Sequence, residues 1–323
     1  MNHQHEPLIP LDSVRLADAA VTGNKAAVLG ELAHLGENVP DGYCLTTGPF
    51  QTLLASLVRP RAANRHWQKL AEEIRDSSLP ADLSRALSNS LPKIRPASPS
   101  LSAYCVRSSA SIEDRPDFSF AGQFRTEIGL STFTSVEAAI RRCWASLFND
   151  HVVAYVTQVG LDLTDAAMAV LIQALVPADK SGVLFTRDPV TGHDIFIVEA
   201  TWGFGSPLVG GEITPDTVRL DASGNLLEYS VGSKKEALVL VNKQLRRVRL
   251  SPEERSRRCL SERDLHLLLE MGHRIDKALR PGQDIEFAFS GESLWVLQAR
   301  PITTLEQVTH AGDQRDLDDY AIY

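Results

Sequence analysis

Hydrophobic and polar positions in the first half of the chain repeat mostly with the period of helices. Asn24 is suited to cap a helix and Gly36 to end it. Between them, apolar residues recur at every third or fourth position: Val28, Leu29, Leu32 and Leu35. The same period predicts further helices over Phe50–Leu57, Arg65–Arg75 and Leu79–Leu91, and two more within Ser135–Val159.

Short apolar or alternating runs, which are typical of strands, dominate the second half. The predicted strands are Ala103–Arg107, Ala167–Val176, Gly182–Thr186, Ile195–Glu199, Thr217–Leu220, Leu226–Val231 and Ala237–Val241. A late helix, Glu262–Leu279, precedes a closing hairpin of Asp284–Phe289 and Ser293–Ala299. The Pro- and Ser-rich segment Pro92–Ser102 is expected to be a linker or exposed loop. This mixture predicts an α+β protein with two lobes.

The composition is that of a globular protein, since 43% of the 323 residues are hydrophobic and 23% are charged. With 33 basic and 41 acidic residues, the net charge of -8 argues against a general nucleic-acid or anionic-membrane binder but allows a local basic pocket. Four widely spaced cysteines indicate neither a thiolate metal site nor a disulfide framework, and reduced thiols suit a cytoplasmic location. The first residues do not resemble a signal peptide, and the longest apolar run, Ala166–Ala178, is too short to span a bilayer.

The closing hairpin carries the most informative polar residues. Glu286 and Gln298 both lie six residues from Glu292, so a bulged antiparallel hairpin brings their side chains face to face. Two oxygen donors at one point suit Mg²⁺, which completes its shell with waters and phosphate oxygens. Arg300, two residues beyond Gln298, falls on the same face and suits a phosphate. The alternative is an ordinary hairpin with an exposed polar face.

Two further cations are candidates for binding phosphate. Lys25 lies in the first turn of its predicted helix, where it opposes the helix dipole unless an anion is held there; a solvated surface lysine is the alternative. Arg107 closes a mostly apolar strand, so we expect a partly buried guanidinium with either a phosphate or a carboxylate as partner. The later segment Ser119–Gln123 offers backbone N–H groups that can approach phosphate oxygens, because Gly122 relaxes the limit on φ. The alternative for this segment is a surface turn with a buried Phe120.

Two polar side chains interrupt predicted strands. Gln173 lies within an apolar run, where its amide must be satisfied either by a nucleotide or by neighbouring backbone groups. Glu199 ends a predicted strand and precedes Trp202-Gly-Phe-Gly205. From this position it can contact ribose hydroxyls; the alternative is an ordinary strand-end carboxylate.

Six segments follow one another in a characteristic order: Gly-x-Lys-x-x-x-Leu-Gly (Gly23–Gly30), Val-Arg-Ser-Ser-Ala (Val106–Ala110), Glu-Asp-x-Pro-Asp-x-Ser-Phe-Ala-Gly-Gln (Glu113–Gln123), Ser-Gly-Val-Leu-Phe-Thr (Ser181–Thr186), Gly-Glu-Ile-Thr-Pro-Asp (Gly211–Asp216) and Asp-Ile-Glu-Phe to Leu-Gln-Ala-Arg-Pro (Asp284–Pro301). In this order they resemble the N-terminal ATP-binding domain of the pyruvate phosphate dikinase, phosphoenolpyruvate synthase and rifampicin phosphotransferase family. The resemblance runs from about Asp18 to Leu305.

The resemblance implies an ATP-grasp fold, with ATP in the cleft between two α+β lobes, and Mg²⁺ beside it. It divides the chain into an extension (1–17), a helix-rich first lobe with a phosphate lid (18–160), a strand-rich lobe with adenine and metal sites (161–305) and a tail (306–323). By role, it assigns phosphate contacts and catalysis to Lys25, Arg107 and Arg300, the lid to Gly122, adenine to Gln173 and Leu175, the sugar to Glu199, and Mg²⁺ to Glu286 and Gln298.

The sequence departs from the family pattern at three positions. Asn24 replaces the second glycine of a usual Gly-Gly-Lys, and Phe118 stands where a smaller residue is common. Ser206 stands where family members often have a glutamate after the Trp-Gly-x-Gly segment. These changes affect lid fit or nucleotide affinity and leave the proposed metal and phosphate ligands intact.

Full-length family members add a domain with a phosphate-accepting histidine and a domain that binds the final acceptor. The chain ends soon after Pro301, and we interpret His310 in the tail as coincidental because it lacks the preceding glycines and a surrounding domain. The first hypothesis is therefore the ATP-cleaving subunit of a split dikinase, which passes the terminal phosphates of ATP to a histidine on a separate carrier protein or domain and releases AMP. An acceptor-binding subunit would use the phosphate on a small molecule such as pyruvate, an antibiotic or a biosynthetic intermediate; no nucleic-acid or membrane partner is expected. The alternatives are a stand-alone ATP-grasp kinase or ligase and a non-catalytic nucleotide-responsive module.

Overall fold

The computed structural model describes residues 6–57, 67–99, 101–110, 125–158, 163, 167–209, 211–242 and 244–302. The chain divides into unit 1 (Met1–Pro177 with Asn242–Gln244) and unit 2 (Ala178–Val241 with Leu245–Tyr323). Each unit combines helices with an antiparallel sheet, which confirms the α+β class. The predictions for Gly122, Phe118 and the tail with His310 lie outside the described residues.

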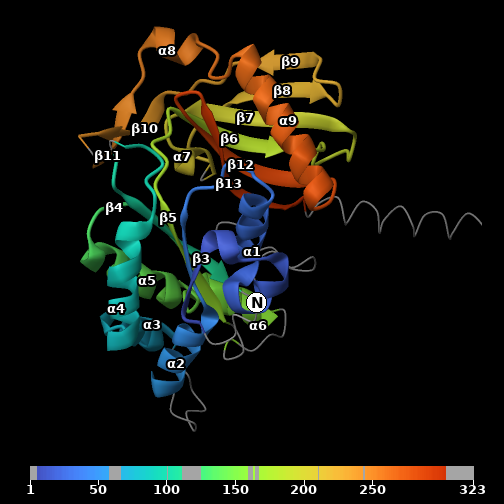
Figure 1. The fold of residues 1–323 in the computed structure, drawn as a ribbon. Coiled ribbons are helices and arrows are strands. Elements are labelled where there is room, and N and C mark those ends of the chain that lie inside the picture. Colours follow the sequence, from blue (N-terminus) through green and yellow to red (C-terminus); the bar gives the residue numbers. More distant parts are fainter. Residues whose placement is uncertain are drawn as a thin grey trace, which may run out of the picture. The chain divides into compact units, whose positions relative to one another are not determined.

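Unit 1 is built on a five-stranded sheet with the order β1-β2-β5-β3-β4, in which each neighbouring pair is antiparallel (Figure 1). Its strands are β1 Leu8–Pro10, β2 Gly42–Leu45, β3 Tyr104–Ala110, β4 Thr126–Leu130 and β5 Met168–Ala174. Its helices are α1 Ala19–His34, α2 Thr47–Leu57, α3 Trp67–Asp76, α4 Ala81–Ser90, α5 Phe133–Ser146 and α6 Asp150–Gln158, with short 3-10 turns at Leu11–Ser13, Leu16–Asp18 and Leu91–Lys93.

Helices α2 to α6 and one face of this sheet enclose the main apolar core of unit 1. The sheet contributes Val106 and Ile172, and the helices contribute aromatic residues such as Phe50 and Trp144, whose ring centroids lie 5.9 Å apart. Burial of these large side chains is the main stabilising contribution to the unit. Helix α1 packs on the opposite face, where strand alternation places Arg107.

The predicted start and end of the first helix both have a structural counterpart. Helix α1 begins at Ala19, before the expected start at Asn24. It is interrupted at Gly23, whose φ of 72° and ψ of 160° are accessible to glycine, so Asn24 is the first residue of a second helical segment rather than its N-cap. At the other end, Gly36 has a φ of 90°, and its N–H and that of Glu37 donate to the carbonyls of Ala33 and Leu32. This pair of bonds is the Schellman motif, in which glycine ends a helix.

Unit 2 contains a six-stranded antiparallel sheet with the order β13-β12-β6-β7-β8-β9 and a separate pair, β10-β11 (Figure 1). The strands are β6 Lys180–Phe185, β7 Ile195–Trp202, β8 Asp216–Asp221, β9 Leu226–Ser230, β10 Glu236–Val241, β11 Gln244–Arg249, β12 Gln283–Ser290 and β13 Ser293–Pro301. The helices are α7 Ser206–Val209, α8 Pro252–Ser256 and α9 Glu262–Ala278.

Helix α9 covers one face of the six-stranded sheet. Its first turn is closed by a capping box between Ser261 and Asp264, as expected for a serine followed three residues later by an acid. In its middle, a Cβ on Gly272 would lie 2.7 Å from Phe196 and 3.1 Å from Leu184, so this glycine allows a close approach of helix to sheet. The opposite face of the sheet is therefore the one left for polar side chains.

Strand β5 belongs to unit 1, although the expected boundary at 160/161 assigned it to the second lobe. It pairs with β2 and β3, both of which are far away in the sequence, and the division falls at Pro177/Ala178. Strands β1, β2, β4 and β11 were not predicted. Strands β1 and β2 have only three and four residues, and β4 and β11 carry polar or charged residues where an apolar or alternating run was sought.

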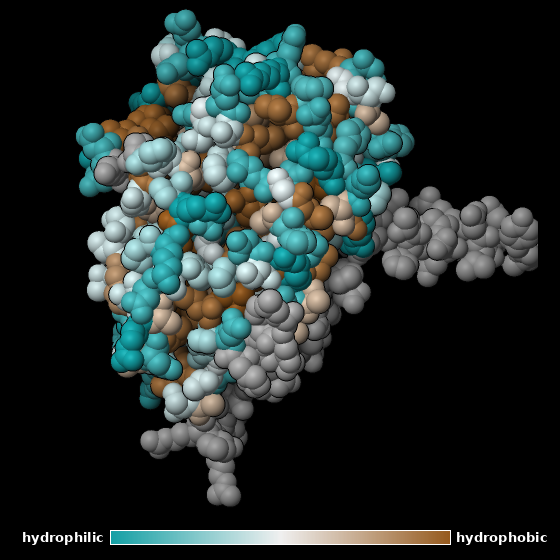
Figure 2. Space-filling view, viewed as in Figure 1, coloured by the Kyte–Doolittle hydropathy of each residue, from teal (hydrophilic) through white to brown (hydrophobic). Residues whose placement is uncertain are grey.

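The helices and the surface of the described residues have two further features. Among the described residues, none of the helices combines the length and the apolar character that crossing a bilayer requires. Hydrophilic residues cover α8, where Glu253 and Glu254 are exposed (Figure 2).

Candidate functional site

Strand register brings five polar side chains onto one face of the unit 2 sheet. Glu286 pairs directly with Gln298, as the hairpin count predicted, and Asp284 pairs with Arg300. The register shift after Glu286 makes this possible, because Leu297 is the extra residue of a β-bulge.

The same face continues through β6 to β7. Val183 of β6 lies between Glu286 and Glu199 in the cross-strand row, so the two carboxylates are two strands apart on one face. We call Glu199, Asp284, Glu286, Gln298 and Arg300 the carboxylate face. Gln298 is only 7% exposed, so the alternative of an ordinary exposed hairpin does not describe it.

Carboxylates on this face carry an electrostatic cost when ionised. Burial raises the pKa of Asp284, and the nearby Glu286 adds to this effect, while Arg300 opposes it through hydrogen bonds of 2.7 and 2.8 Å to one carboxylate oxygen. Burial, with a contribution from Asp284, also raises the pKa of Glu199. A bound cation would reduce this repulsion and favour the ionised forms.

The donor set fits a magnesium ion that keeps most of its water and phosphate ligands. Glu286 and Gln298 supply two hard oxygens from facing positions of β12 and β13. Among the described residues, no group of three or more His, Cys, Asp or Glu side chains forms a metal cage. Glu286 and Gln298 alone leave most of a magnesium coordination shell to water or other oxygen ligands.

Asp284 is the member of the carboxylate face for which the sequence predicted no role. Its position two residues before Glu286 places it on the same side of β12, and that alternation was the signal that could have identified it. It holds the guanidinium of Arg300 in place beside Glu286.

In unit 1, the structure brings Lys25 next to the strand that carries Arg107. The Lys25 Nζ donates to the carbonyl oxygen of Ser108 at 3.0 Å, and Lys25 is 6% exposed, which rules out a solvated surface lysine. Arg107 is 8% exposed, so the expected burial is confirmed, but it lies in the middle of β3 rather than at its end, because the strand continues to Ala110. Two buried cations thus lie on adjoining elements of one unit.

Gln173 and Leu175 make contacts within unit 1. The Gln173 amide donates to the Pro40 carbonyl at 2.9 Å, and strand register places Gln173 beside Cys105 on the face that also carries Arg107. Leu175 is 5% exposed and its N–H donates to Ala103. These contacts agree with the alternative of an amide satisfied by the backbone, and the adenine role of both residues stays a prediction.

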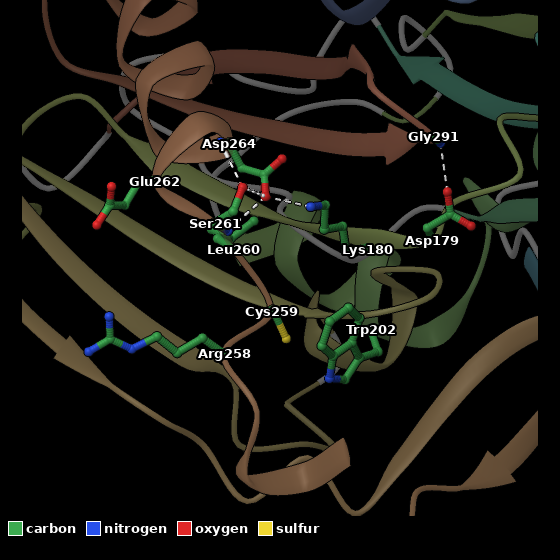
Figure 3. A pocket seen from close by; sticks show the side chains of 10 residues that line it. All are labelled: Asp179, Lys180, Trp202, Arg258, Cys259, Leu260, Ser261, Glu262, Asp264 and Gly291. Atoms are coloured by element: carbon green, nitrogen blue, oxygen red, sulfur yellow. Dashed lines mark hydrogen bonds and ion pairs between the residues drawn. The ribbon is translucent and has the colours of Figure 1, made fainter. Parts of the chain in front are cut away.

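A cavity of about 480 Å³ in unit 2 lies on the other side of the sheet (Figure 3). Lys180, which lines it, is three residues from Val183 and pairs with Trp202, so both side chains are on the face that α9 covers. Its polar groups bind one another: Lys180 contacts Asp264, and Asp179 accepts the N–H of Gly291 at 2.6 Å. The cavity is therefore distinct from the carboxylate face.

Carboxylates, an amide oxygen and buried cations are the groups with which proteins bind a metal–polyphosphate, so these side chains are typical of a nucleotide-binding protein. The chain belongs to the family described as pyruvate phosphate dikinase, AMP/ATP-binding domain, whose model matches residues 19–319.

The curated relatives carry the names that the sequence motifs indicated. A probable phosphoenolpyruvate synthase of Methanothermobacter thermautotrophicus is 34% identical over 309 residues, covering 90% of this chain and 45% of that protein. A rifampicin phosphotransferase of Streptomyces sviceus is 32% identical over 330 residues, covering 96% of this chain and 37% of that protein. The chain thus spans less than half the length of these relatives.

A solved D-alanine-D-alanine ligase from Coxiella burnetii aligns over 96% of this chain and 64% of its own, with 9% identity and a TM-score of 0.34, which is too low to support an argument. Two α+β units, each with an antiparallel sheet, are consistent with the ATP-grasp fold that the family implies.

Proposed function

We propose that this chain binds ATP together with Mg²⁺ and transfers the terminal phosphates of ATP to a histidine on a separate carrier protein or domain, releasing AMP. The observation that carries the proposal is the carboxylate face, where Glu286 and Gln298 face each other beside Arg300. Membership of an AMP/ATP-binding family supports the choice of nucleotide.

Each side chain has a stated task in this proposal. Glu286 and Gln298 hold Mg²⁺, which would neutralise phosphate charge. The Arg300 guanidinium leaves its ion pair with Asp284 and contacts a phosphate instead. In unit 1, Lys25 and Arg107 bind phosphate, and Gln173 and Leu175 line the adenine. In unit 2, Glu199 contacts the sugar. Phosphoryl transfer depends on such positioning and charge neutralisation more than on a protein nucleophile.

The transfer itself conserves atoms and charge. A ring nitrogen of the carrier histidine attacks the β-phosphorus, an N–P bond forms, and the bond from the β-phosphorus to the α,β-bridging oxygen breaks, so that AMP leaves. The β- and γ-phosphates stay together on the histidine, and the ring proton passes to solvent. The protein aligns the attacking nitrogen and the leaving oxygen and excludes competing water. Water then removes the γ-phosphate as inorganic phosphate, and the histidine passes the remaining phosphate to a small-molecule acceptor. The names of the relatives make pyruvate and an antibiotic the first candidates.

Calorimetry on matched hairpin variants tests the nucleotide site. Glu286→Gln should weaken binding of Mg·ATP at least about tenfold, because a ligand charge is lost. Glu292→Gln, the same change at an exposed position of the same hairpin, should bind like the parent protein. Equal affinities of Glu286→Gln and the parent would contradict the assignment.

Product analysis tests the reaction. The chain is incubated with ATP, with and without a purified histidine-carrier domain from a phosphoenolpyruvate synthase, and the nucleotides are separated by chromatography. AMP that appears only with the carrier supports the dikinase proposal. ADP formed with a small-molecule acceptor would support a stand-alone kinase or ligase, and nucleotide binding without turnover would support a non-catalytic module.

A further inference from the structure

The second segment of α1 begins against the end of β3. The N–H of Ala26 donates to the hydroxyl oxygen of Ser109 at 3.1 Å, across 83 positions of sequence. Beside it, the Lys25 ammonium donates to the carbonyl of Ser108 at 3.0 Å. We call Gly23–Ala26 together with Arg107–Ser109 the helix–strand junction.

Ser109 acts at this junction as a helix cap supplied from a distant strand. The first N–H groups of a helical segment have no partner within it and are usually satisfied by a side chain just before the helix. Here the acceptor comes from β3, and Ser109 has 0% exposure, so water does not compete for the bond.

The fit between the two elements is close. A Cβ on Gly23 would lie 2.1 Å from the carbonyl oxygen of Ser109 and 2.4 Å from its hydroxyl oxygen. The backbone of α1 therefore reaches Ser109 only because residue 23 has no side chain. This contact fixes the position of the helix segment that carries Lys25 along the length of β3.

Arg107 is two residues before Ser109 on the same strand, so the two side chains share the face on which α1 packs. A rotation or slide of the helix start would change the separation of the Lys25 and Arg107 side chains. The bond from Ala26 to Ser109 opposes that movement directly, because it joins the first turn of the helix segment to the strand.

We propose that Ser109 is a positioning residue for phosphate binding: by capping the helix segment of Lys25 from the strand of Arg107, it fixes the two cations relative to each other. The inference rests on the proposed function, which assigns both cations to the polyphosphate. Ser109 itself contacts no phosphate in this account and acts through Lys25.

A double-mutant cycle separates this role from a general structural one. Ser109→Ala should weaken Mg·ATP binding about tenfold in the parent protein, since a buried N–H is left without its acceptor and the helix start shifts. In a Lys25→Met background, Ser109→Ala should change affinity less than about twofold, because the cation that it positions is already gone. Inorganic tripolyphosphate with Mg²⁺ should show the same pattern, which locates the effect at the phosphates.

Ser146→Ala is the matched control. Its hydroxyl is also buried in unit 1 and donates to the Cys143 carbonyl within α5. This variant should bind Mg·ATP like the parent in both backgrounds. Ser109→Cys, which is slightly larger and is a weaker acceptor, replaces Ser109→Ala if the alanine variant fails to fold, and a loss in the same direction is expected.

Two results would overturn the inference while leaving the proposed function intact. One is a parent protein that binds Mg·ATP and a Ser109→Ala variant that binds it equally well. The other is an equal loss from Ser109→Ala with and without Lys25. A parent protein that binds no ATP would overturn the proposed function and this inference together.

Discussion

Replacing Gly23 by alanine tests the helix–strand junction through protein stability. The backbone at this position has a φ of 72° and a ψ of 160°, a combination that side-chain-bearing residues adopt at a cost of about 2 kcal/mol. The new Cβ would also lie 2.1 Å from the Ser109 carbonyl oxygen, so α1 has to move away from β3. Overpacking of this kind costs about another 2 kcal/mol. We expect a total destabilisation of about 4 kcal/mol.

Gly36 supplies the matched control. It has a φ of 90°, but no atom lies within 4 Å of the position that a Cβ would take, so Gly36→Ala carries the conformational cost without the collision. We expect Gly36→Ala to lose about 1–2 kcal/mol. The difference between the two variants therefore isolates the contact of Gly23 with Ser109.

Urea unfolding followed by circular dichroism gives the free energies, and hydrogen exchange with mass spectrometry reports on α1 itself. Gly23→Ala should increase exchange in the second segment of α1 and in the last residues of β3. Equal losses of stability for Gly23→Ala and Gly36→Ala, with unchanged exchange in α1, would refute the close approach and the cap at Ser109.

Three further predictions concern charged groups. Lys234 and Asp216 form an ion pair in which both side chains are 0% exposed, so Lys234→Met should destabilise by about 3–5 kcal/mol in urea unfolding. Adding Asp216→Leu should not restore this loss, because the Asp216 carboxylate also accepts hydrogen bonds from the N–H groups of Gly232 and Cys259 and from the Tyr229 hydroxyl. Backbone N–H groups, led by that of Val190, lower the pKa of Asp188 from 3.8 to about 2. The stability lost in Asp188→Asn should therefore be constant above about pH 5 and should shrink as the pH falls from 3.8 toward 2. A loss of stability that does not depend on pH would contradict this assignment. Burial raises the pKa of Glu199 above its usual 4.5, so the ionised carboxylate destabilises the folded protein at neutral pH. Glu199→Gln should therefore stabilise the nucleotide-free protein at about pH 7 but not below pH 4.5. Thermal melts at both pH values measure this difference.

The sequence contained the local information about the fold. Helix α9 was predicted within one residue of its end, because a serine–aspartate capping box and a regular apolar stripe define it. The pairing of Glu286 with Gln298 followed from counting residues around the turn and allowing one bulge. Both results depend on residues close in the chain, where pattern and geometry coincide.

Information that depends on distant partners was not accessible in the same way. Strand β5 is apolar in any context, and only its pairing with β2 and β3 places it in unit 1. The role of Asp284 depends on Arg300 across the hairpin, and that of Ser109 on an N–H 83 positions earlier. The nucleotide assignments came from the order of six motifs rather than from any single pattern.

The bulge at Leu297 changes the side of the sheet to which β13 directs its alternate residues. Val296 pairs with Phe287, which belongs to the apolar side under α9, whereas Gln298, only two positions later, pairs with Glu286 on the other side. In an unbroken strand these two residues of β13 would share a side. A hairpin that lacked Leu297 would therefore keep Gln298 opposite Glu286, with one residue fewer before the turn. Related hairpins of different length are thus best aligned outward from this facing pair rather than from the turn.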